Sequence, residues 1–269
     1  MGAAPVPSQP EGVQHAELLP AVERIAREAG ALIMQVYAGD FDVRGKADAS
    51  PVTDADERAE RCIVAGLRQL TPEVPIVAEE AAARGEAPPP GARFWLVDPL
   101  DGTREFVSRN GEFTVNIALV EQGHPVLGVV YEPVADRLVA GGVGQGAWLH
   151  DAQGRRAIHC RRPASEGLVL ACSRSHGDEA AMNAWLGSRR VLRRITVGSS
   201  LKFGLIAAGE ADLYPRLGRT MEWDTAAGHA VLRAAGGCVL DLQGATLRYG
   251  KPGFENPHFV ALGLPESTG

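Results

Sequence analysis

Residues 95–103, WLVDPLDGT, decide the fold, because an apolar strand gives way there to two carboxylates in a turn. The strand is expected to end at Val97, and Asp98 and Asp101 then follow three positions apart. Carboxylates placed in this way can face one pocket and bridge hard cations. The same residues also fit an ordinary Asp-Pro turn with a capping Asp, so this stretch alone leaves both interpretations open.

The last residues of this stretch, from Pro99 to Thr103, favour the binding of an anion. Pro99 fixes the backbone, and Gly102 permits a tight turn. Thr103 then presents a hydroxyl beside the free N–H groups at the start of a short helical segment. The N–H groups of Gly102 and Thr103 are therefore expected to hold an anion next to the two carboxylates.

Acidic residues recur at three further places where an apolar segment begins or ends. They are Asp54 and Asp56 at the start of one apolar helix, Glu79 and Glu80 after the strand PIVA, and Asp224 at the start of another helix. Each has an ordinary explanation on its own. Acids in a first helical turn and at an N-cap are common, and a pair of acids after a strand is often a solvated loop.

The hydrophobic pattern predicts a first half of two helices followed by a run of strands. Apolar residues recur at three- and four-residue steps over Glu17–Ala38 and Asp54–Leu70, which is typical of amphipathic helices. Thr53 or Ser50 is expected to cap the second helix. The strands predicted from short apolar runs are Ile76–Val77, Phe94–Val97, Thr114–Val120, Val126–Tyr131, Leu138–Gly142 and Ala147–His150.

Helices and strands alternate in the rest of the chain. A change of composition near Arg161–Pro163 separates an N-terminal α+β half (15–162) from a C-terminal α/β half (163–269), and three prolines predict a flexible N-terminal arm over residues 1–14. In the second half the predicted strands are Leu168–Cys172, Leu192–Thr196, Asp212–Tyr214 and Gly237–Leu240. The predicted helices are Glu179–Leu186, Ser200–Ala208 and Thr225–Ala235.

Composition and charge exclude several classes of protein. The 269 residues are 45% hydrophobic and 22% charged, which argues against intrinsic disorder, collagen and a pure coiled coil. A formal net charge of −6 argues against a dedicated binder of nucleic acid or anionic membranes, since both need a basic surface. A phosphorylated small molecule stays compatible with this charge, because a bound metal reverses the local field.

Cysteine usage and apolar run lengths favour the cytoplasm. Cys62, Cys160, Cys172 and Cys238 form no CxxC pair, so neither a structural zinc site nor a disulfide framework is expected. No apolar run approaches the roughly 18–20 residues that a membrane span requires, and no signal-peptide pattern is present. We therefore expect a cytoplasmic protein, with room for peripheral association at the inner membrane.

Together the acidic motifs resemble a known family, the inositol-monophosphatase-like, lithium-sensitive phosphatases. These motifs are VTDADERAE (52–60), IVAEE (76–80), WLVDPLDGTREF (95–106) and EWDTAAGHAVLRAAGG (222–237). Three further segments look like the CysQ-type 3′(2′),5′-bisphosphate nucleotidase branch, namely SRSH (173–176), GSSLKF (198–203) and LYPR (213–216). The resemblance runs from about Glu17 to Phe259. It implies a layered αβαβα sandwich of the sugar-phosphatase-like fold, with the acidic site in the cleft between the two halves.

The resemblance also implies a site for two or three Mg²⁺ ions. Glu79, Asp98 and the carbonyl of Leu100 look like ligands of a first ion. Asp98 looks like a bridge to a second ion, which Asp101 and Asp224 complete. Some relatives hold a third ion through Glu79 and water.

Thr103 and Asp56 resemble the family's pair that orients and deprotonates the attacking water, whereas Asp54 has no counterpart among its catalytic residues. Two cations about 3.5–4 Å apart can hold both the attacking and the leaving oxygen of an in-line displacement. No covalent phosphoenzyme is needed, and no Cys or His nucleophile stands in a motif.

Residues outside the acidic motifs are expected to bind the rest of the substrate. The candidates are Gly102 and Thr103 for the cleaved phosphate, His176 for the nucleotide, and Ser199, Ser200, Lys202 and Arg216 for a second phosphate. The ordinary alternatives stay open here, since His176 also fits a surface loop and Lys202 also fits a solvated helix.

The function that the resemblance implies is Mg²⁺-dependent hydrolysis of the 3′-phosphate of adenosine 3′,5′-bisphosphate, giving AMP and phosphate by metal-activated water. The sulfated precursor, 3′-phosphoadenylyl sulfate, is a second candidate substrate. Such an activity clears an inhibitory by-product of sulfate assimilation. The alternatives are an inositol or sugar monophosphatase of the same superfamily and, in another class, a non-catalytic metal- or nucleotide-binding regulator. The presence of both Asp56 and Thr103 disfavours the regulator, because metal retention alone requires no water-activating pair.

The partner expected is thus a small bisphosphate nucleotide, with neither nucleic acid nor an integral membrane association. Many relatives form homodimers, but no interface stripe is legible in this sequence.

Overall fold

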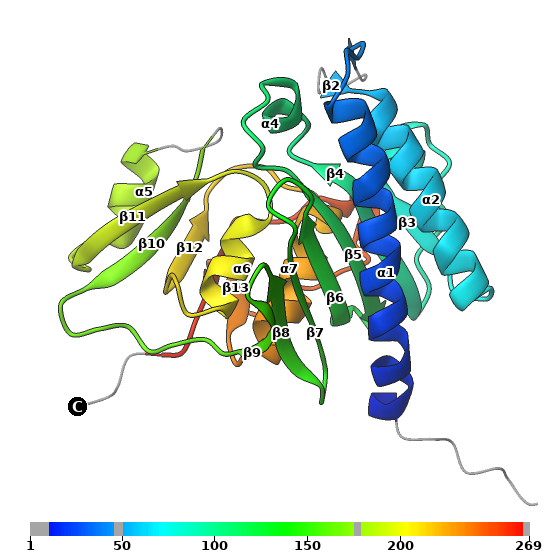
Figure 1. Ribbon diagram of the computed structural model, residues 1–269. Helices are drawn as coiled ribbons and strands as arrows, with labels where there is room; N and C mark the ends of the chain where they lie inside the picture. Colours follow the sequence, from blue (N-terminus) through cyan, green and yellow to red (C-terminus); the bar gives the residue numbers. More distant parts are fainter. Residues whose placement is uncertain (1–10, 46–50, 175–178, 266–269) are drawn as a thin grey trace, which may run out of the picture.

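The computed structural model describes residues 11–45, 51–174 and 179–265, which form helices around two main β-sheets (Figure 1). The helices are α1 (Glu11–Tyr37), α2 (Asp54–Leu70), α3 (Glu79–Ala83), α4 (Thr103–Val107), α5 (Glu179–Leu186), α6 (Leu201–Ala207), α7 (Glu222–Ala234) and the 3₁₀ turn η1 (Pro252–Phe254). The strands of the first half are β1 (Arg44–Gly45), β2 (Pro51–Val52), β3 (Ile76–Ala78), β4 (Arg93–Asp101), β5 (Thr114–Glu121), β6 (His124–Glu132), β7 (Arg137–Gly142), β8 (Gly146–Asp151) and β9 (Gly154–Ile158). Those of the second half are β10 (Leu168–Ser173), β11 (Val191–Val197), β12 (Leu213–Arg216), β13 (Cys238–Asp241) and β14 (Phe259–Leu262).

The two main sheets follow the chain in different ways. The seven-stranded sheet runs in sequence order from β3 to β9; β3 is parallel to β4, and every later pair is antiparallel. The five-stranded sheet has the order β11-β10-β12-β14-β13, with β10 parallel to both of its neighbours and β14 antiparallel to both of its own. The short strands β1 and β2 pair separately.

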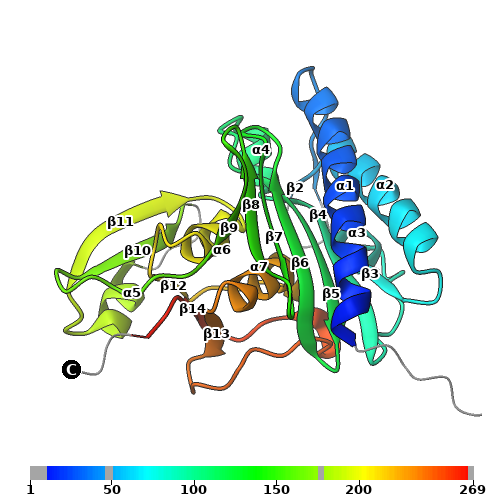
Figure 2. The same ribbon diagram turned by 60° about the horizontal axis from the view of Figure 1, so that its bottom comes forward.

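Helices and sheets alternate in five layers (Figure 2). Helices α1 and α2 cover one face of the seven-stranded sheet, with Ile25 and Trp95 in the cluster between them. Helices α6 and α7 lie between the two sheets, where Phe203 and Phe259 belong to one large cluster. Helix α5 covers the far face of the five-stranded sheet through Met182. This arrangement confirms the predicted αβαβα sandwich.

Strand β4 owes its unbroken apolar sequence to cover on both faces. Phe94 and Leu96 belong to the cluster beside α6 and α7, whereas Trp95 and Val97 belong to the cluster beneath α1 and α2. Successive side chains of a strand point to opposite faces, so a strand covered on both sides is apolar at every position. Polar residues return only where β4 leaves the core, which places its two carboxylates at the edge of the sheet.

The first helix begins earlier than the sequence pattern suggested. Residues 11–14, predicted as part of a flexible arm, belong to α1, while residues 1–10 lie outside the described residues. His15 accounts for the extension, because it is only 3% exposed and its Nε2 lies 3.0 Å from Oε1 of Glu121 on β5. A contact between residues so far apart in sequence leaves no trace in helical periodicity.

Six short elements escaped the sequence analysis, namely α3, β1, β2, β9, β14 and η1. Helix α3 has only five residues, too few to display a helical period. Strand β9 is an edge strand whose first four residues are exposed, so it needs no apolar side chains there. The acid pair Glu79–Glu80, predicted to end a strand, in fact also opens α3.

The predicted boundary at residues 162 and 163 falls between the two main sheets. Strand β9 ends at Ile158 and β10 begins at Leu168. Helix α7 of the second half packs against β5, β6 and β7 of the first half, and the central cluster contains residues of both sheets. The division into two halves therefore stays a prediction. Among the described residues no helix is both long and apolar enough to cross a lipid bilayer.

The stability of the central layer depends on pH through His229 on α7. This histidine is completely buried, and its Nδ1 lies 3.0 Å from the hydroxyl of Tyr249. Burial, together with the charges of Arg233 and His124, lowers the pKa of His229 to about 3. Since the unfolded chain takes up this proton near pH 6.5, His229 contributes stability above that pH and loses it as the pH falls towards 3.

We predict that His229→Asn flattens the acid side of the stability curve, because the amide keeps a polar atom near Tyr249 and does not titrate. The difference in unfolding free energy between wild type and variant should change with pH between about 6 and 4, by up to ~1.4 kcal/mol per pH unit. Urea unfolding at several pH values measures this difference. Parallel curves for the two proteins would contradict the assignment.

Candidate active site

Parallel pairing of β3 and β4 brings two acids side by side. Ala78 pairs with Val97, so Glu79 and Asp98, the next residue of each strand, emerge at the same edge of the sheet. The two carboxyl groups lie close enough together for Glu79 to raise the pKa of Asp98. The sequence predicted both residues as ligands of one ion, and the strand register explains why they meet.

An irregularity in the pairing of β4 and β5 turns a third acid to the same side. Asp98 pairs with Asn116 and Asp101 pairs with Thr114, so two residues of β4 lie opposite Val115 alone. In a regular strand, residues three positions apart point to opposite faces. The extra residue of the bulge cancels this alternation and lets Asp98 and Asp101 face one space.

Helix α7 contributes the fourth acid from the second half of the chain. Asp224 is the third residue of this helix, and its Oδ2 accepts the N–H of the N-cap residue Met221 at 2.8 Å, as the acid of a capping box does. Ser200, 2% exposed, ties this helix to β4: its Oγ lies 2.7 Å from Oδ2 of Asp101 and 2.6 Å from the carbonyl oxygen of Asp224. The Ser200 hydroxyl is thus engaged by protein atoms, and its predicted contact with a phosphate stays a prediction.

The acids repel one another strongly. Burial, followed by the charges of Glu79, Asp101 and Asp224, raises the pKa of Asp98 well above its usual range. Burial and the charges of Asp101 and Glu79 likewise raise the pKa of Asp224. Burial also raises the pKa of Asp101, against hydrogen bonds from Ser200 and other groups. Four carboxyl groups therefore lie close enough together for three of them to act on the pKa of the fourth, Asp98.

Such a set of donors fits divalent cations. Hard cations take carboxylate and carbonyl oxygens, and they remove the repulsion that raises these pKa values. Within the described residues, no three acidic, histidine or cysteine side chains already enclose one point at which an ion could sit. The ligand set of Glu79, Asp98, Leu100, Asp101 and Asp224 therefore stays a prediction, which the shared electrostatics of the four acids supports.

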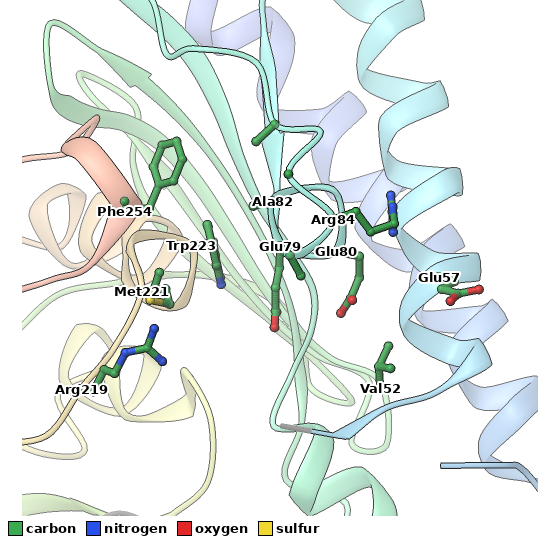
Figure 3. Close-up of a pocket in the computed structure, with 14 residues that line it drawn as sticks. Val52, Glu57, Glu79, Glu80, Ala82, Arg84, Arg219, Met221, Trp223 and Phe254 are labelled. Atoms are coloured by element: carbon green, nitrogen blue, oxygen red, sulfur yellow. The ribbon is translucent and has the colours of Figure 1, made fainter. Parts of the chain in front are cut away.

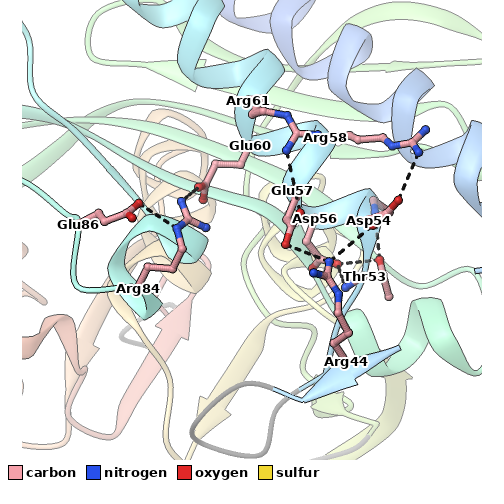
Figure 4. A network of polar contacts seen from close by, with 11 residues as sticks. Arg44, Thr53, Asp54, Asp56, Glu57, Arg58, Glu60, Arg61, Arg84 and Glu86 are labelled. Atoms are coloured by element: carbon pink, nitrogen blue, oxygen red, sulfur yellow. Dashed lines mark hydrogen bonds and ion pairs between the residues drawn. The ribbon is translucent and has the colours of Figure 1, made fainter. Parts of the chain in front are cut away.

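Asp56 and Thr103 meet beside this space. The Thr103 Oγ1 lies 3.3 Å from Oδ1 of Asp56 and 3.3 Å from the carbonyl oxygen of Leu100. The other carboxylate oxygen of Asp56 accepts the backbone N–H and the hydroxyl of Thr53, each at 2.8 Å, which caps α2 (Figure 4). The cap fixes Asp56, 1% exposed, and leaves Oδ1 for Thr103. The two residues predicted to activate water are thus in contact.

Asp54 points away from this pair. It lies on the exposed side of α2, where Arg58 at 3.3 Å and Arg44 at 3.5 Å are its ion-pair partners (Figure 4). Its predicted structural role agrees with this position. His176 lies outside the described residues.

The turn after Asp101 requires glycine. Gly102 has a φ of 94°, and a Cβ there would come within 3.2 Å of the carbonyl oxygen of Glu112 and 3.3 Å of the Cβ of Ser199. Ser199 itself has a φ of 41°, and the described residues offer its buried Oγ no hydrogen-bond partner. The backbone of Ser199 is therefore strained, because it adopts the left-handed conformation between this turn and α6, and its hydroxyl is unsatisfied.

Lys202 and Arg216 are two buried cations close to the acids. Lys202, 3% exposed, donates from Nζ to the carbonyl oxygens of Val197 (3.2 Å) and Ser199, so it is not the solvated helix lysine that the sequence also allowed. Burial lowers the pKa of Lys202 to about 8; Asp101 opposes this shift and Arg216 adds to it. Arg216 donates to Oγ of Ser173 at 3.1 Å. An anion between the two cations would relieve their repulsion.

A pocket of about 580 Å³ adjoins the acids (Figure 3). Glu79 lies on one of its walls and Trp223, Met221 and Phe254 on another. The rings of Trp223 and Phe254 are 5.8 Å apart. The site is therefore open to a ligand larger than phosphate on this side.

One residue that the sequence analysis overlooked belongs to the site. Asn116, 1% exposed, donates from Nδ2 to Oδ2 of Asp101 at 3.3 Å and to Oγ of Ser200 at 2.9 Å. The signal was present, since Asn116 is the polar residue within the otherwise apolar run TVNIALV (114–120). A buried amide in such a strand needs a partner, and here the partner is a site acid.

Known proteins share this sequence and fold over nearly the whole chain. A sequence model of the inositol monophosphatase family matches residues 14–262 of this chain. The chain is 49% identical over 245 residues to the 3′(2′),5′-bisphosphate nucleotidase CysQ of Escherichia coli (strain K12), covering 90% of this chain and 98% of that protein. It is 41% identical over 254 residues to the protein of the same name from Buchnera aphidicola, covering 92% and 94% of the two chains.

A solved structure agrees with these matches. CysQ from Bacteroides thetaiotaomicron, described as a bacterial member of the inositol monophosphatase family, superimposes with a TM-score of 0.77 at 36% identity, covering 93% of this chain and 97% of that one.

We predict that the variant Asp98→Asn distinguishes the effect of carboxylate repulsion on thermal stability from the effect of metal binding. Without divalent ions the variant should melt no lower than wild type, and up to a few °C higher, because one repelling carboxylate is gone. Added Mg²⁺ should raise the Tm of wild type and leave that of the variant nearly unchanged. Thermal unfolding in chelator and in Mg²⁺ measures both effects. An equal rise of Tm in the two proteins would exclude Asp98 as a ligand.

Proposed function

The chain belongs to the inositol monophosphatase family, and on this basis we propose that it hydrolyses the 3′-phosphate of adenosine 3′,5′-bisphosphate. It is a 3′(2′),5′-bisphosphate nucleotidase, a metal-dependent phosphatase. The observation that carries the chemistry is the meeting of four acids with the Asp56–Thr103 pair. The choice of a bisphosphate nucleotide rests on the 49% identity to proteins of that name.

The residues of the chain divide the work of hydrolysis. Divalent ions, which we propose to be two or three Mg²⁺ held by the acids and the Leu100 carbonyl, supply charge neutralisation of the phosphoryl oxygens and a lowered pKa of water. Thr103 orients the attacking water through its hydroxyl, and Asp56 accepts the proton. The new P–O bond forms as the bond to the ribose 3′ oxygen breaks, and that oxygen takes a proton from a second water molecule to leave as a hydroxyl. The proton on Asp56 then passes to the hydroxide that remains, so one water is consumed overall. The products are AMP and phosphate.

A second phosphate distinguishes this substrate from a simple monoester. Lys202 and Arg216 are buried cations whose charges act on Asp101 and Asp224, and Arg216 lowers the pKa of Lys202. Two cations that repel each other in a poorly hydrated place are a receptor for a dianion. We assign them to the 5′-phosphate, with the hydroxyl of Ser199 beside them.

Phosphate release with Mg²⁺ tests the proposed function. Adenosine 3′,5′-bisphosphate should be hydrolysed with a higher kcat/KM than inositol monophosphate and fructose bisphosphate. Asp56→Asn should lower kcat by about 10²–10⁴-fold, because no group takes the proton, and should keep the Mg²⁺-dependent rise of Tm. Comparable turnover of inositol phosphate would favour the sugar-monophosphatase alternative. No release from any of the three substrates would favour the regulator.

We predict that Lys202→Met changes the choice of substrate, since Met keeps the apolar stem and removes the charge. The KM for adenosine 3′,5′-bisphosphate should rise about 10- to 100-fold, the effect of losing a charged hydrogen bond. The KM for adenosine 3′-monophosphate, which lacks only the second phosphate, should stay close to its wild-type value. Equal losses on both substrates would mean that Lys202 acts only by holding the Ser199 turn.

A further inference from the structure

We propose that Glu60, in the second turn of α2, is the positioning residue for Glu79: it fixes the backbone of α3 through hydrogen bonds and so sets the place of one metal ligand. This inference rests on the proposed function in one respect, the assignment of Glu79 as a ligand.

Helix α3 has no cap of its own. It has five residues and follows β3 directly, and its N-cap, Ala78, has no side chain that could accept a hydrogen bond. The N–H groups of a first helical turn have no partner within the helix and need one elsewhere. Here Oε2 of Glu60 accepts the N–H of Glu80 at 2.8 Å and that of Ala81 at 3.4 Å. The cap of α3 is therefore supplied by another helix.

Burying the carboxylate of Glu60 costs free energy of solvation, so its hydrogen bonds and ion pair have to compensate. Glu60 is only 6% exposed, so its carboxylate is held away from solvent. Arg84 of the same segment compensates, since its Nη2 lies 3.3 Å from Oε1 of Glu60 (Figure 4). Arg84 also holds Glu86 through its Nε at 2.8 Å. Glu60 thus meets the α3 segment at both ends, with one oxygen on its N–H groups and the other on Arg84.

The position of Glu60 on α2 couples two parts of the site. Asp56 and Glu60 are four residues apart, so they occupy the same side of the helix one turn apart. Asp56 contacts Thr103, and Glu60 binds the residue that follows Glu79. One rigid helix therefore sets the distance between the water-activating pair and the acid that faces Asp98. A shift of Glu79 would carry its carboxylate away from the other acids.

Direct metal titration of variants tests this role. Free Mn²⁺ measured by electron paramagnetic resonance gives the Kd without substrate. Glu60→Ala leaves the α3 N–H groups uncapped and should raise the Kd about 10- to 100-fold, the usual cost of losing an outer-shell partner. Glu60→Gln keeps an amide oxygen as acceptor and should lose distinctly less. At saturating Mn²⁺ both variants should recover most of the wild-type kcat.

Glu86→Gln is the matched control, because it removes the other carboxylate of Arg84 and leaves the cap of α3 intact. Its Kd should equal that of wild type. Equal losses in Glu60→Gln and Glu60→Ala would overturn the proposal in favour of a charge effect, and so would an equal loss in Glu86→Gln. If Glu60→Ala does not fold, a wild-type Kd in Glu60→Gln together with a loss in Glu60→Ser upholds the proposal. Mn²⁺ binding without nucleotidase activity would refute the proposed function alone, whereas wild type without Mn²⁺ binding would refute both.

Discussion

Repulsion among four carboxyl groups is the constraint on which the rest of the structure depends. Asp98 lies among Glu79, Asp101 and Asp224, and burial, followed by the charges of these three acids, raises its pKa. A group of acids in a poorly hydrated space favours its own protonation, unless cations share it. The family's dependence on metals follows from this constraint. The fold has to hold the acids close together against their repulsion, and it does so mainly through the backbone.

Hydrogen bonds at the N-termini of helices keep several of these acids in position. Asp56 caps α2 with one oxygen and meets Thr103 with the other, and Asp224 caps α7 while facing the site. Each carboxylate is therefore oriented by N–H groups that would otherwise lack partners, and each gains from the positive end of the helix dipole. Ser200 then ties α7 to β4. Structural hydrogen bonds and the proposed chemistry use the same side chains, so the site is rigid where it carries most charge.

The sequence located the acids more reliably than their surroundings. Motif order and apolar strands identified Glu79, Asp98, Asp101 and Asp224, because each follows or opens an element whose apolar pattern is strong. The partners of these acids were harder to find. Asn116 and Ser200 act through contacts with residues 15 and 99 positions away in the chain. Lys202 was predicted to bind a second phosphate, with a solvated helix lysine as the alternative, and only its contacts with the turn at Ser199 show that it is buried.

The amino-acid sequence by itself determined the succession of helices and strands and the order of the acidic motifs, since apolar periodicity and local turn chemistry act over a few residues. The resemblance carried by those motifs implied the five-layer class of the fold. Only the tertiary structure decided which acids share a space. The parallel register of β3 with β4 puts Glu79 beside Asp98, and one extra residue in a bulge turns Asp101 to the same side. Pairing register and the placement of α7 are set by contacts between distant segments, and those contacts follow from the packed core as a whole.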